Sequence, residues 1–405
     1  MTEAYPMLSL KERERRWKRT RDLMEEKGLE CLVVFGKGRE KFDSYLTNEP
    51  LEGIIVFPLS GEPMYYLWTP NRATLHLETV LKDEKWWVDE VRVGSSGASV
   101  VEALQEKGMD RAKIGTVGMS FRGDGIVPYK TWAYILEKLP KATFVDITQP
   151  YCEMMMIKSD EELKLIRRSA EIGEMACEVM MKVVKVGVSE AEIYSAVMST
   201  IYSHGAVTSA AFFILKTGPD NVSWTSPIWV HRGGAPRVLE KGDIVNCELF
   251  PIYGGFETQQ QMAIALKPID PVNQKCADIA RRSYEAGVRA LRPGRGFKEV
   301  CEEMDRPLLE AGAFNLSPLI HSLMPLAYVS PMRLDPEQLP ELKKIQGVTK
   351  VRQLGDLIIQ PGMVFEFEPN ASLGKKRVNI GGAVLVTPHG AEELNKLATV
   401  MQVSD

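Results

Sequence analysis

The chain has 405 residues, and its 50 Lys and Arg against 54 Asp and Glu give a net charge of −4 at pH 7. This balance argues against a nucleic-acid partner, because such proteins usually carry a basic surface. Hydrophobic residues make up 44% and charged residues 26%, the composition of an ordinary globular protein of more than one domain.

The N-terminus and the cysteines predict a cytoplasmic protein. The first residues, MTEAYPMLSLKERERRWKRT, are charged where a signal peptide needs its apolar stretch. No segment approaches the roughly 18 consecutive apolar residues of a membrane helix, so we expect no membrane association. The six cysteines lie far apart, without CxxC or another metal-type spacing; they are Cys31, Cys152, Cys177, Cys247, Cys276 and Cys301. Scattered unpaired cysteines are typical of a reducing compartment.

Residues 1–153 alternate between predicted strands and helices. The charged amphipathic pattern over 8–28 predicts a helix that ends at Gly28. Further helices are predicted over 99–107 and 125–139. Short apolar runs predict strands at Cys31–Phe35, Gly53–Pro58, Pro63–Leu67, Lys113–Val117 and Thr143–Val145. Such alternation is typical of an α/β domain, and this one contains no catalytic constellation.

A change in composition near Met154 predicts a second domain over 154–405. The capping-box pair Ser159 and Glu162 predicts the start of a helix that ends at Gly187. A second pair, Ser189 and Glu192, predicts a helix that continues through His204. The later predictions are strands from about 210 to 266, helices over 272–292 and 297–312, and strands in MVFEFEP and GGAVLVTP. This order predicts an α+β domain with helices on one face of a sheet.

Four motifs of the second domain carry a family resemblance. They are Ile157–Ser159 with the helix after it, Gly242–Val245, Pro361–Phe365 and Val384–Thr387. In order and spacing they resemble the pita-bread family of creatinase, aminopeptidase P, prolidase and methionine aminopeptidase. The resemblance implies an α+β pita-bread domain preceded by a smaller α/β creatinase-type N-terminal domain. It also implies a homodimer.

Most members of that family bind two metal ions through two Asp, one His and two Glu. The resemblance places these five positions on Glu248, Gln259, His321, Glu368 and Gly381, so only His321 and Glu368 keep the family's residue type. An amide is a poor ligand for such ions and glycine has no side chain to offer. We therefore expect no dinuclear centre, no metal ligand and no cofactor. A single ion on Glu248, His321 and Glu368 remains an alternative.

The departure from the metal-binding pattern resembles creatinase, which uses the same fold without metal. His231 lies twelve residues before Asp243, the spacing at which creatinase carries its catalytic histidine. An imidazole titrates near neutral pH and can both accept and donate a proton during one turnover. The resemblance implies that His231 is the general acid/base, with His321 and Glu368 as further catalytic residues.

The other candidate residues are acidic, amide or aromatic. Glu366 and Glu368 alternate with two Phe on a predicted strand and therefore share a face. Buried carboxylates form either structural ion pairs or a pair that holds a cationic substrate and tunes the histidine. Aromatic rings likewise either pack in the core or bind alkylated ammonium and guanidinium groups. The predicted substrate-binding residues are Glu248, Gln259, Gln261, Trp229, Tyr253 and Tyr328.

These observations favour a metal-independent, creatinase-like hydrolase that cleaves a C–N bond in a small, cationic metabolite. A lyase on the same fold would use the same histidine. A mononuclear metallohydrolase of the Xaa-Pro peptidase type is the second enzyme hypothesis. The third hypothesis is a catalytically silent relative that binds a ligand or a protein.

Overall fold

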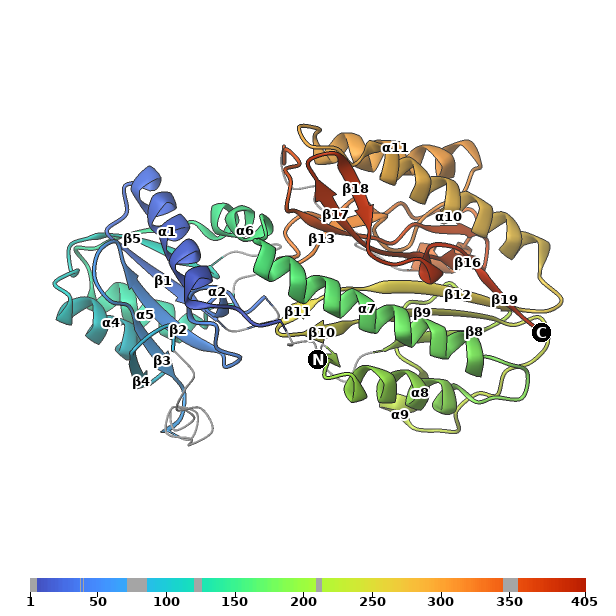
Figure 1. Cartoon of the computed structure of the whole chain (residues 1–405), viewed down its shortest axis with the longest axis horizontal. Coiled ribbons are helices and arrows are strands. Elements are labelled where there is room, and N and C mark those ends of the chain that lie inside the picture. Colours follow the sequence, from blue (N-terminus) through green and yellow to red (C-terminus); the bar gives the residue numbers. More distant parts are fainter. Residues whose placement is uncertain are drawn as a thin grey trace, which may run out of the picture. The chain divides into compact units, whose positions relative to one another are not determined.

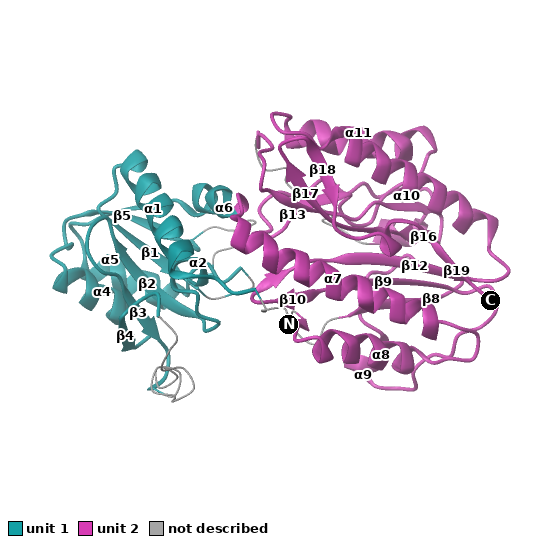
Figure 2. Cartoon of the chain, in the orientation of Figure 1, with its two compact units in different colours: residues 1–155 teal, residues 156–405 magenta. Residues whose placement is uncertain are grey.

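The computed structural model describes residues 6–36, 38, 40–70, 86–119, 126–208, 213–344 and 356–405. The chain divides into two compact units, Met1–Met155 and Met156–Asp405 (Figures 1 and 2). Parts of two predicted elements, at 125 and 211–212, lie outside the described residues.

Unit 1 contains a six-stranded mixed sheet with strand order β4-β3-β2-β1-β5-β6. Its strands are β1 (Cys31–Phe35), β2 (Gly53–Pro58), β3 (Met64–Leu67), β4 (Glu90–Val93), β5 (Lys113–Val117) and β6 (Thr143–Asp146). Its helices are α1 (Leu10–Lys27), α2 (Ser44–Thr47), α4 (Gly97–Glu106), α5 (Tyr129–Lys138) and α6 (Thr148–Met156). The predicted strands are confirmed, whereas β4, α2 and α6 were not predicted.

The boundaries of α1 follow from its end residues. The Ser9 side chain accepts hydrogen bonds from the backbone N–H groups of Lys11 and Glu12, which have no partner within the helix. Gly28 ends the helix in the left-handed conformation at φ +62°, which glycine adopts without strain. The predicted end of this helix at Gly28 is confirmed.

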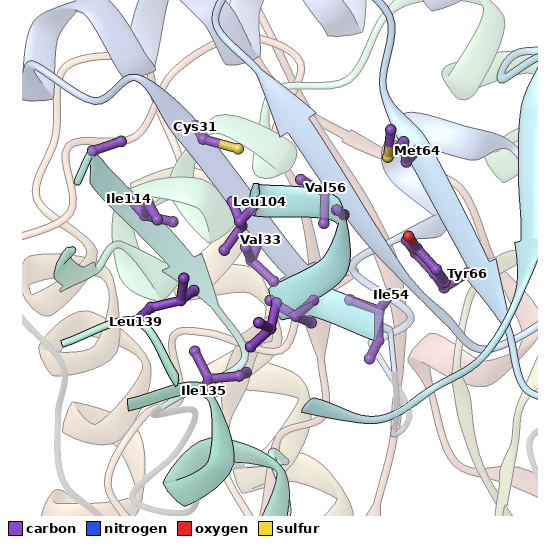
Figure 3. Close-up of a cluster of buried hydrophobic side chains, with 14 of the residues drawn as sticks. Cys31, Val33, Ile54, Val56, Met64, Tyr66, Leu104, Ile114, Ile135 and Leu139 are labelled. Carbon is purple, nitrogen blue, oxygen red and sulfur yellow. The ribbon is translucent and has the colours of Figure 1, made fainter. Parts of the chain in front are cut away.

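The core of unit 1 lies between one face of the sheet and helices α4 and α5 (Figure 3). Val33 and Val56 from neighbouring strands, Leu104 of α4 and Ile135 of α5 are at most 1% exposed. Burying a side chain of this kind contributes about 1.5–3 kcal/mol. This apolar packing accounts for the alternation of strands and helices in the sequence.

The helices of unit 2 form two pairs. In the first pair, α7 (Asp160–Val183) and α8 (Glu190–Ser203) each begin with the predicted capping box. The second pair is α10 (Pro271–Ala290) and α11 (Phe297–Glu310). Figure 1 shows the members of each pair side by side. The predicted end of the first helix at Gly187 is wrong: α7 ends at Val183, and Gly187 forms a later turn at φ +90°.

The main sheet of unit 2 has the strand order β13-β14-β17-β12-β9-β8. These strands are β8 (Ile214–Gly218), β9 (Ile244–Leu249), β12 (Gln260–Leu266), β13 (Ile320–Ser322), β14 (Val364–Phe367) and β17 (Gly381–Thr387), extended by β18 (Gly390–Glu393) and β19 (Gln402–Ser404). Strands β15 (Asn370–Leu373) and β16 (Lys376–Asn379) pair with each other. Strands β7 (Val207–Thr208), β10 (Pro251–Tyr253) and β11 (Phe256–Glu257) form a third sheet.

The helices cover one face of the main sheet. Cys247 of β9 contacts Met180 of α7, with their sulfur atoms 3.4 Å apart. The ring of Phe367 in β14 lies 5.6 Å from the ring of Tyr284 in α10. Because successive strand residues point to opposite faces, the residues next to Cys247 and Phe367 in sequence, including Glu248, point away from these helices.

Three short helical segments of the described residues of unit 2 lie outside the two helix pairs. Helix α9 (Ile228–Arg232) contains His231, whose surroundings the sequence predicted to be irregular. Two 3-10 turns span Pro340–Lys344 and Leu397–Thr399. None of the helices in the described parts of the chain is both long and apolar enough to cross a membrane.

Candidate active site

Four buried glutamates lie close together in unit 2. We call Glu248, Glu257, Glu366 and Glu368 the acidic cluster; each is at most 6% exposed. They interact electrostatically with one another, although they come from β9, β11 and the end of β14. Burying several carboxyl groups together is costly unless protons or positive charges accompany them. The acidic cluster therefore marks the candidate active site.

Strand pairing brings the site residues together. In the central strand β12, Gln261 lies opposite Glu248 on one side and opposite Gly381 on the other. Glu366 of β14 lies opposite His321 of β13. Residues directly opposite one another on paired strands share a face. Antiparallel register thus gathers residues that are far apart in sequence.

His321 is surrounded by hydrogen-bond acceptors. Its Nε2 lies 3.2 Å from Oε1 of Gln259 and 3.4 Å from Oε1 of Glu368. Its Nδ1 lies 3.0 Å from the carbonyl oxygen of Ser322. The Gln259 amide is oriented by its Nε2, which donates to Glu257 at 2.8 Å. The neighbours of both ring nitrogens are thus oxygen atoms, which hold the ring in one orientation.

Burial holds protons on the acidic cluster. It raises the pKa of Glu248 to about 7, although the hydrogen bond from Trp224 and the neighbouring amide of Gln261 act in the opposite direction. Burial also raises the pKa of Glu366 well above its usual range, and the neighbouring Glu368 adds to this shift. The pKa of Glu368 is raised by burial and by Glu248. Near neutral pH the cluster therefore carries fewer negative charges than its four carboxyl groups could hold, and the remaining charge attracts Arg377.

Arg377 of β16 is a site residue that the sequence did not reveal. It is 2% exposed, and burial lowers the pKa of its guanidinium to about 10. Its Nη2 donates to the hydroxyl of Ser317 at 2.8 Å. In return, its positive charge lowers the pKa values of Glu248 and Glu368. The only sequence signal is the alternation of polar and apolar residues from Arg377 to Ile380.

The residues at the site do not fit a dinuclear metal centre. Throughout the described part of the chain, no group of three or more His, Cys, Asp or Glu is arranged to hold an ion. Both ends of the Gln259 amide are hydrogen-bonded within the protein. A Cβ atom at Gly381 would lie 1.7 Å from the carbonyl oxygen of Phe367, so the backbone leaves no room for a ligand side chain there.

His231 and Trp229 lie together on α9. The side chain of His231 is exposed. The indole N–H of Trp229 donates to Glu190 at 3.1 Å, and its ring packs edge-on against Tyr194 of α8. The described hydrogen bonds of Trp229 therefore run to α8 rather than to the acidic cluster. The roles of both residues remain predictions.

Two predicted substrate-binding tyrosines are buried at other positions. Tyr253 lies in β10, 8% exposed. The ring of Tyr328 packs edge-on against Phe297 of α11, with the ring centres 5.8 Å apart. The described contacts thus join five of the nine predicted residues: Glu248, Gln259, Gln261, His321 and Glu368. The contacts given above for Trp229 and Tyr328 run to α8 and α11.

The two-unit architecture is that of the pita-bread prolidases. The structure matches the dipeptidase PepE from Mycobacterium ulcerans with a TM-score of 0.74 and 19% identity, covering 98% of this chain and 99% of that one. It matches the prolidase from Pyrococcus horikoshii with a TM-score of 0.71 and 18% identity, covering 94% and 98%. The predicted α+β fold class is confirmed.

The chain belongs to metallopeptidase family M24. The model of that family matches residues 164–388, and the model of the creatinase/prolidase N-terminal domain matches residues 16–157. The predicted family is therefore confirmed.

Two relatives with the same percentage identity to this chain are a creatinase and a Xaa-Pro dipeptidase. A creatinase of a Bacillus species is 22% identical over 281 residues, covering 65% of this chain and 62% of that protein. A Xaa-Pro dipeptidase of Pyrococcus furiosus is 22% identical over 280 residues, covering 67% and 72%. The match to the creatinase thus spans less than two thirds of its length.

Proposed function

We propose that this protein is a metal-independent hydrolase of the creatinase type that cleaves a C–N bond in a small cationic metabolite. The observation that carries the proposal is the charge of the site. Four buried carboxyl groups lie beside one buried guanidinium, that of Arg377, and beside the ring of His321. A ligand that brings a positive charge with N–H donors would complete the balance.

Glu248, Glu368 and Gln261 are the proposed ligand-binding groups. Gln261 lies opposite Glu248 on the neighbouring strand, and Glu368 interacts electrostatically with Glu248. Neither amide atom of Gln261 has a regular hydrogen-bond partner within the described residues. Buried polar atoms without partners are rare in folded proteins and commonly mark a site completed by a ligand or water.

His231 is the proposed general acid/base. The segment that leads to it contacts the site at two points. The carbonyl oxygen of Val222 accepts from Arg377 at 3.5 Å, and the indole N–H of Trp224 donates to Glu248. An exposed imidazole at the end of this segment can exchange protons with solvent between steps. His321 lacks a free acceptor nitrogen in the arrangement above, so it serves as a donor to substrate or water.

Three other functions stay open to test. The Xaa-Pro dipeptidases among the relatives favour a metallopeptidase. Gln259 and Gly381 argue against this function, because an amide and a glycine are poor substitutes for two metal-binding carboxylates. A lyase would use the same histidine, and a silent relative would bind without turnover. We also propose that the protein acts in the cytoplasm, since its six cysteines are buried and form no disulfide in the structure.

A ligand screen tests the proposal. Melting temperatures are measured with guanidino, amidino and betaine-type compounds, each paired with a neutral analogue of the same shape. We expect stabilisation by a cationic compound and not by its neutral pair, followed by turnover. Glu368→Gln keeps the shape and removes a charge, so it should weaken binding, whereas Glu392→Gln, an exposed partner of Arg167, should not. Metal-dependent cleavage of Xaa-Pro peptides, with no response to cations, would contradict the proposal.

A further inference from the structure

Arg377 is held in place by its backbone as well as by its side chain. Its backbone N–H donates to Oδ1 of Asn221 at 3.0 Å. Its carbonyl oxygen accepts from Nδ2 of Asn246 in β9 at 2.8 Å. Neighbouring segments on both sides thus fix this position of β16. The backbone of Arg377 is therefore fixed, and this limits the region that its guanidinium can reach.

The guanidinium is connected to Glu368 through one hydroxyl group. Nη2 of Arg377 donates to Oγ of Ser317 at 2.8 Å. Ser317 lies next to Glu368, because Nδ2 of Asn370 donates to the carbonyl oxygens of both residues at 3.1 Å, and the Ser317 side chain lowers the pKa of Glu368. Ser317 is itself 7% exposed, so the connection is shielded from water. Nη1 donates to Val222, whose segment continues to Trp224 and its hydrogen bond with Glu248. Arg377 is therefore linked, through intervening residues, to both Glu368 and Glu248.

A purely structural role would not require a charge at this position. A buried guanidinium is costly to desolvate, and an apolar side chain of similar volume often serves packing equally well. Here the guanidinium keeps one nitrogen, Nε, without a hydrogen-bond partner among the described residues. Its hydrogen bonds alone therefore do not compensate fully for burial. Attraction to Glu248 and Glu368 supplies the remainder.

We propose that Arg377 is a positioning residue: its guanidinium supplies, from within the fold, the positive charge that the family usually obtains from metal ions, and it orients Glu368 through Ser317. The inference concerns the site of the proposed function and rests on it only for the ligand. The charge on Arg377 allows Glu248 and Glu368 to stay buried together. The acidic cluster then needs one organic cation rather than two metal ions.

A double-mutant cycle tests this role without any substrate. Melting temperatures are compared for Arg377→Met, Arg377→Lys, Glu368→Gln and the double variant R377M/E368Q. Removing one partner of a buried charge pair should lower the melting temperature by roughly 10 °C. Lysine keeps the charge without the fork of donors, so Arg377→Lys should lose less than half as much. Removing the opposing charge in R377M/E368Q should restore at least half of the loss.

Arg237 provides the matched control. It pairs with Asp243 in the same unit, and its electrostatic partners do not include the acidic cluster. Arg237→Met should lower the melting temperature by the same amount with and without Glu368→Gln. The proposal is overturned if Arg377→Lys loses as much as Arg377→Met and Glu368→Gln restores nothing. If Arg377→Met alone does not fold, a folded R377M/E368Q supports the proposal and an unfolded one contradicts it. Because no ligand enters the experiment, its failure would leave the proposed function standing.

Discussion

Nε2 of His321 lies 3.4 Å from Oε1 of Glu368, and both side chains are about 95% buried from solvent. The two residues come from β13 and from the end of β14, and the antiparallel register of those strands fixes their approach. The same ring nitrogen faces the amide oxygen of Gln259. His321 is thus hydrogen-bonded within the protein at the atom that a metal-ligand role would require.

Glu248 should make the protein less stable as the pH rises from about 4.5 to about 7. Burial raises the pKa of Glu248 from 4.5 to about 7, so the folded state binds more protons than the unfolded state across this window. Glu248→Gln removes the cost of ionising the buried group and still accepts a hydrogen bond from Trp224. Relative to wild type, it should gain roughly 3 kcal/mol in unfolding free energy between pH 5 and pH 8.

Chemical denaturation at the two pH values checks this prediction. The comparison must be between variants, because the pKa of Asp43 in unit 1 is also raised to about 7 by burial and contributes to the wild-type curve. Glu392→Gln, exposed and paired with Arg167, is the control and should show no gain over this window. A constant difference between wild type and Glu248→Gln would be inconsistent with the buried carboxyl described above.

Trp224→Phe should destabilise the protein more at pH 8 than at pH 5.5. The change keeps an aromatic ring and removes the N–H that donates to Glu248. The lost hydrogen bond matters most when Glu248 is ionised, and its removal should cost about 1 kcal/mol at pH 8 because the ring is half-exposed. Trp229→Phe removes a comparable bond to Glu190 and should cost the same at both pH values. Equal pH profiles for the two variants would argue against a Trp224–Glu248 link.

His231→Ala should lower turnover by roughly 10²–10⁴-fold, the usual contribution of general acid–base catalysis. Stability should change by less than about 0.5 kcal/mol, since the side chain is exposed on α9. His389→Ala, a change at another exposed histidine, is the control for both measurements. Near-normal turnover in His231→Ala would remove the creatinase-like mechanism and leave the fold and family unaffected.

The protein should be a homodimer, as the family resemblance implies. Light scattering on the full chain measures the mass without reference to shape. We expect about twice the single-chain mass of 45.4 kDa. A mass that stays at one chain at all concentrations tested would rule the dimer out.

Much of the fold could be predicted because local sequence determines it. Cys31–Phe35 is a continuous apolar run buried at every position, and the capping boxes at Ser159 and Ser189 begin their helices as predicted. Strand β4 was missed, since Glu90–Val93 is a partly exposed edge strand without an apolar pattern. Helix α9 was missed because Gly233 and Gly234 follow it directly and favour irregular structure.

The site was predicted in part for a different reason. Glu248, His321 and Glu368 were identified by the spacing of family motifs, which reflects strand register. Arg377 follows two lysines, and such a charged run is typical of a solvated surface. Its burial depends on Asn221, Asn246 and Ser317, which come from distant parts of the chain. These long-range contacts cannot be recognised from the sequence around Arg377.

The most direct test of the account measures the metal content of the purified protein by elemental analysis, after expression in medium supplemented with manganese, cobalt and zinc. The central claim is that the charge of the acidic cluster is balanced by Arg377 and an organic cation. It predicts far less than one transition-metal ion per chain and no change in melting temperature when a chelator is added. About two ions per chain, with a fall in melting temperature on chelation, would contradict it.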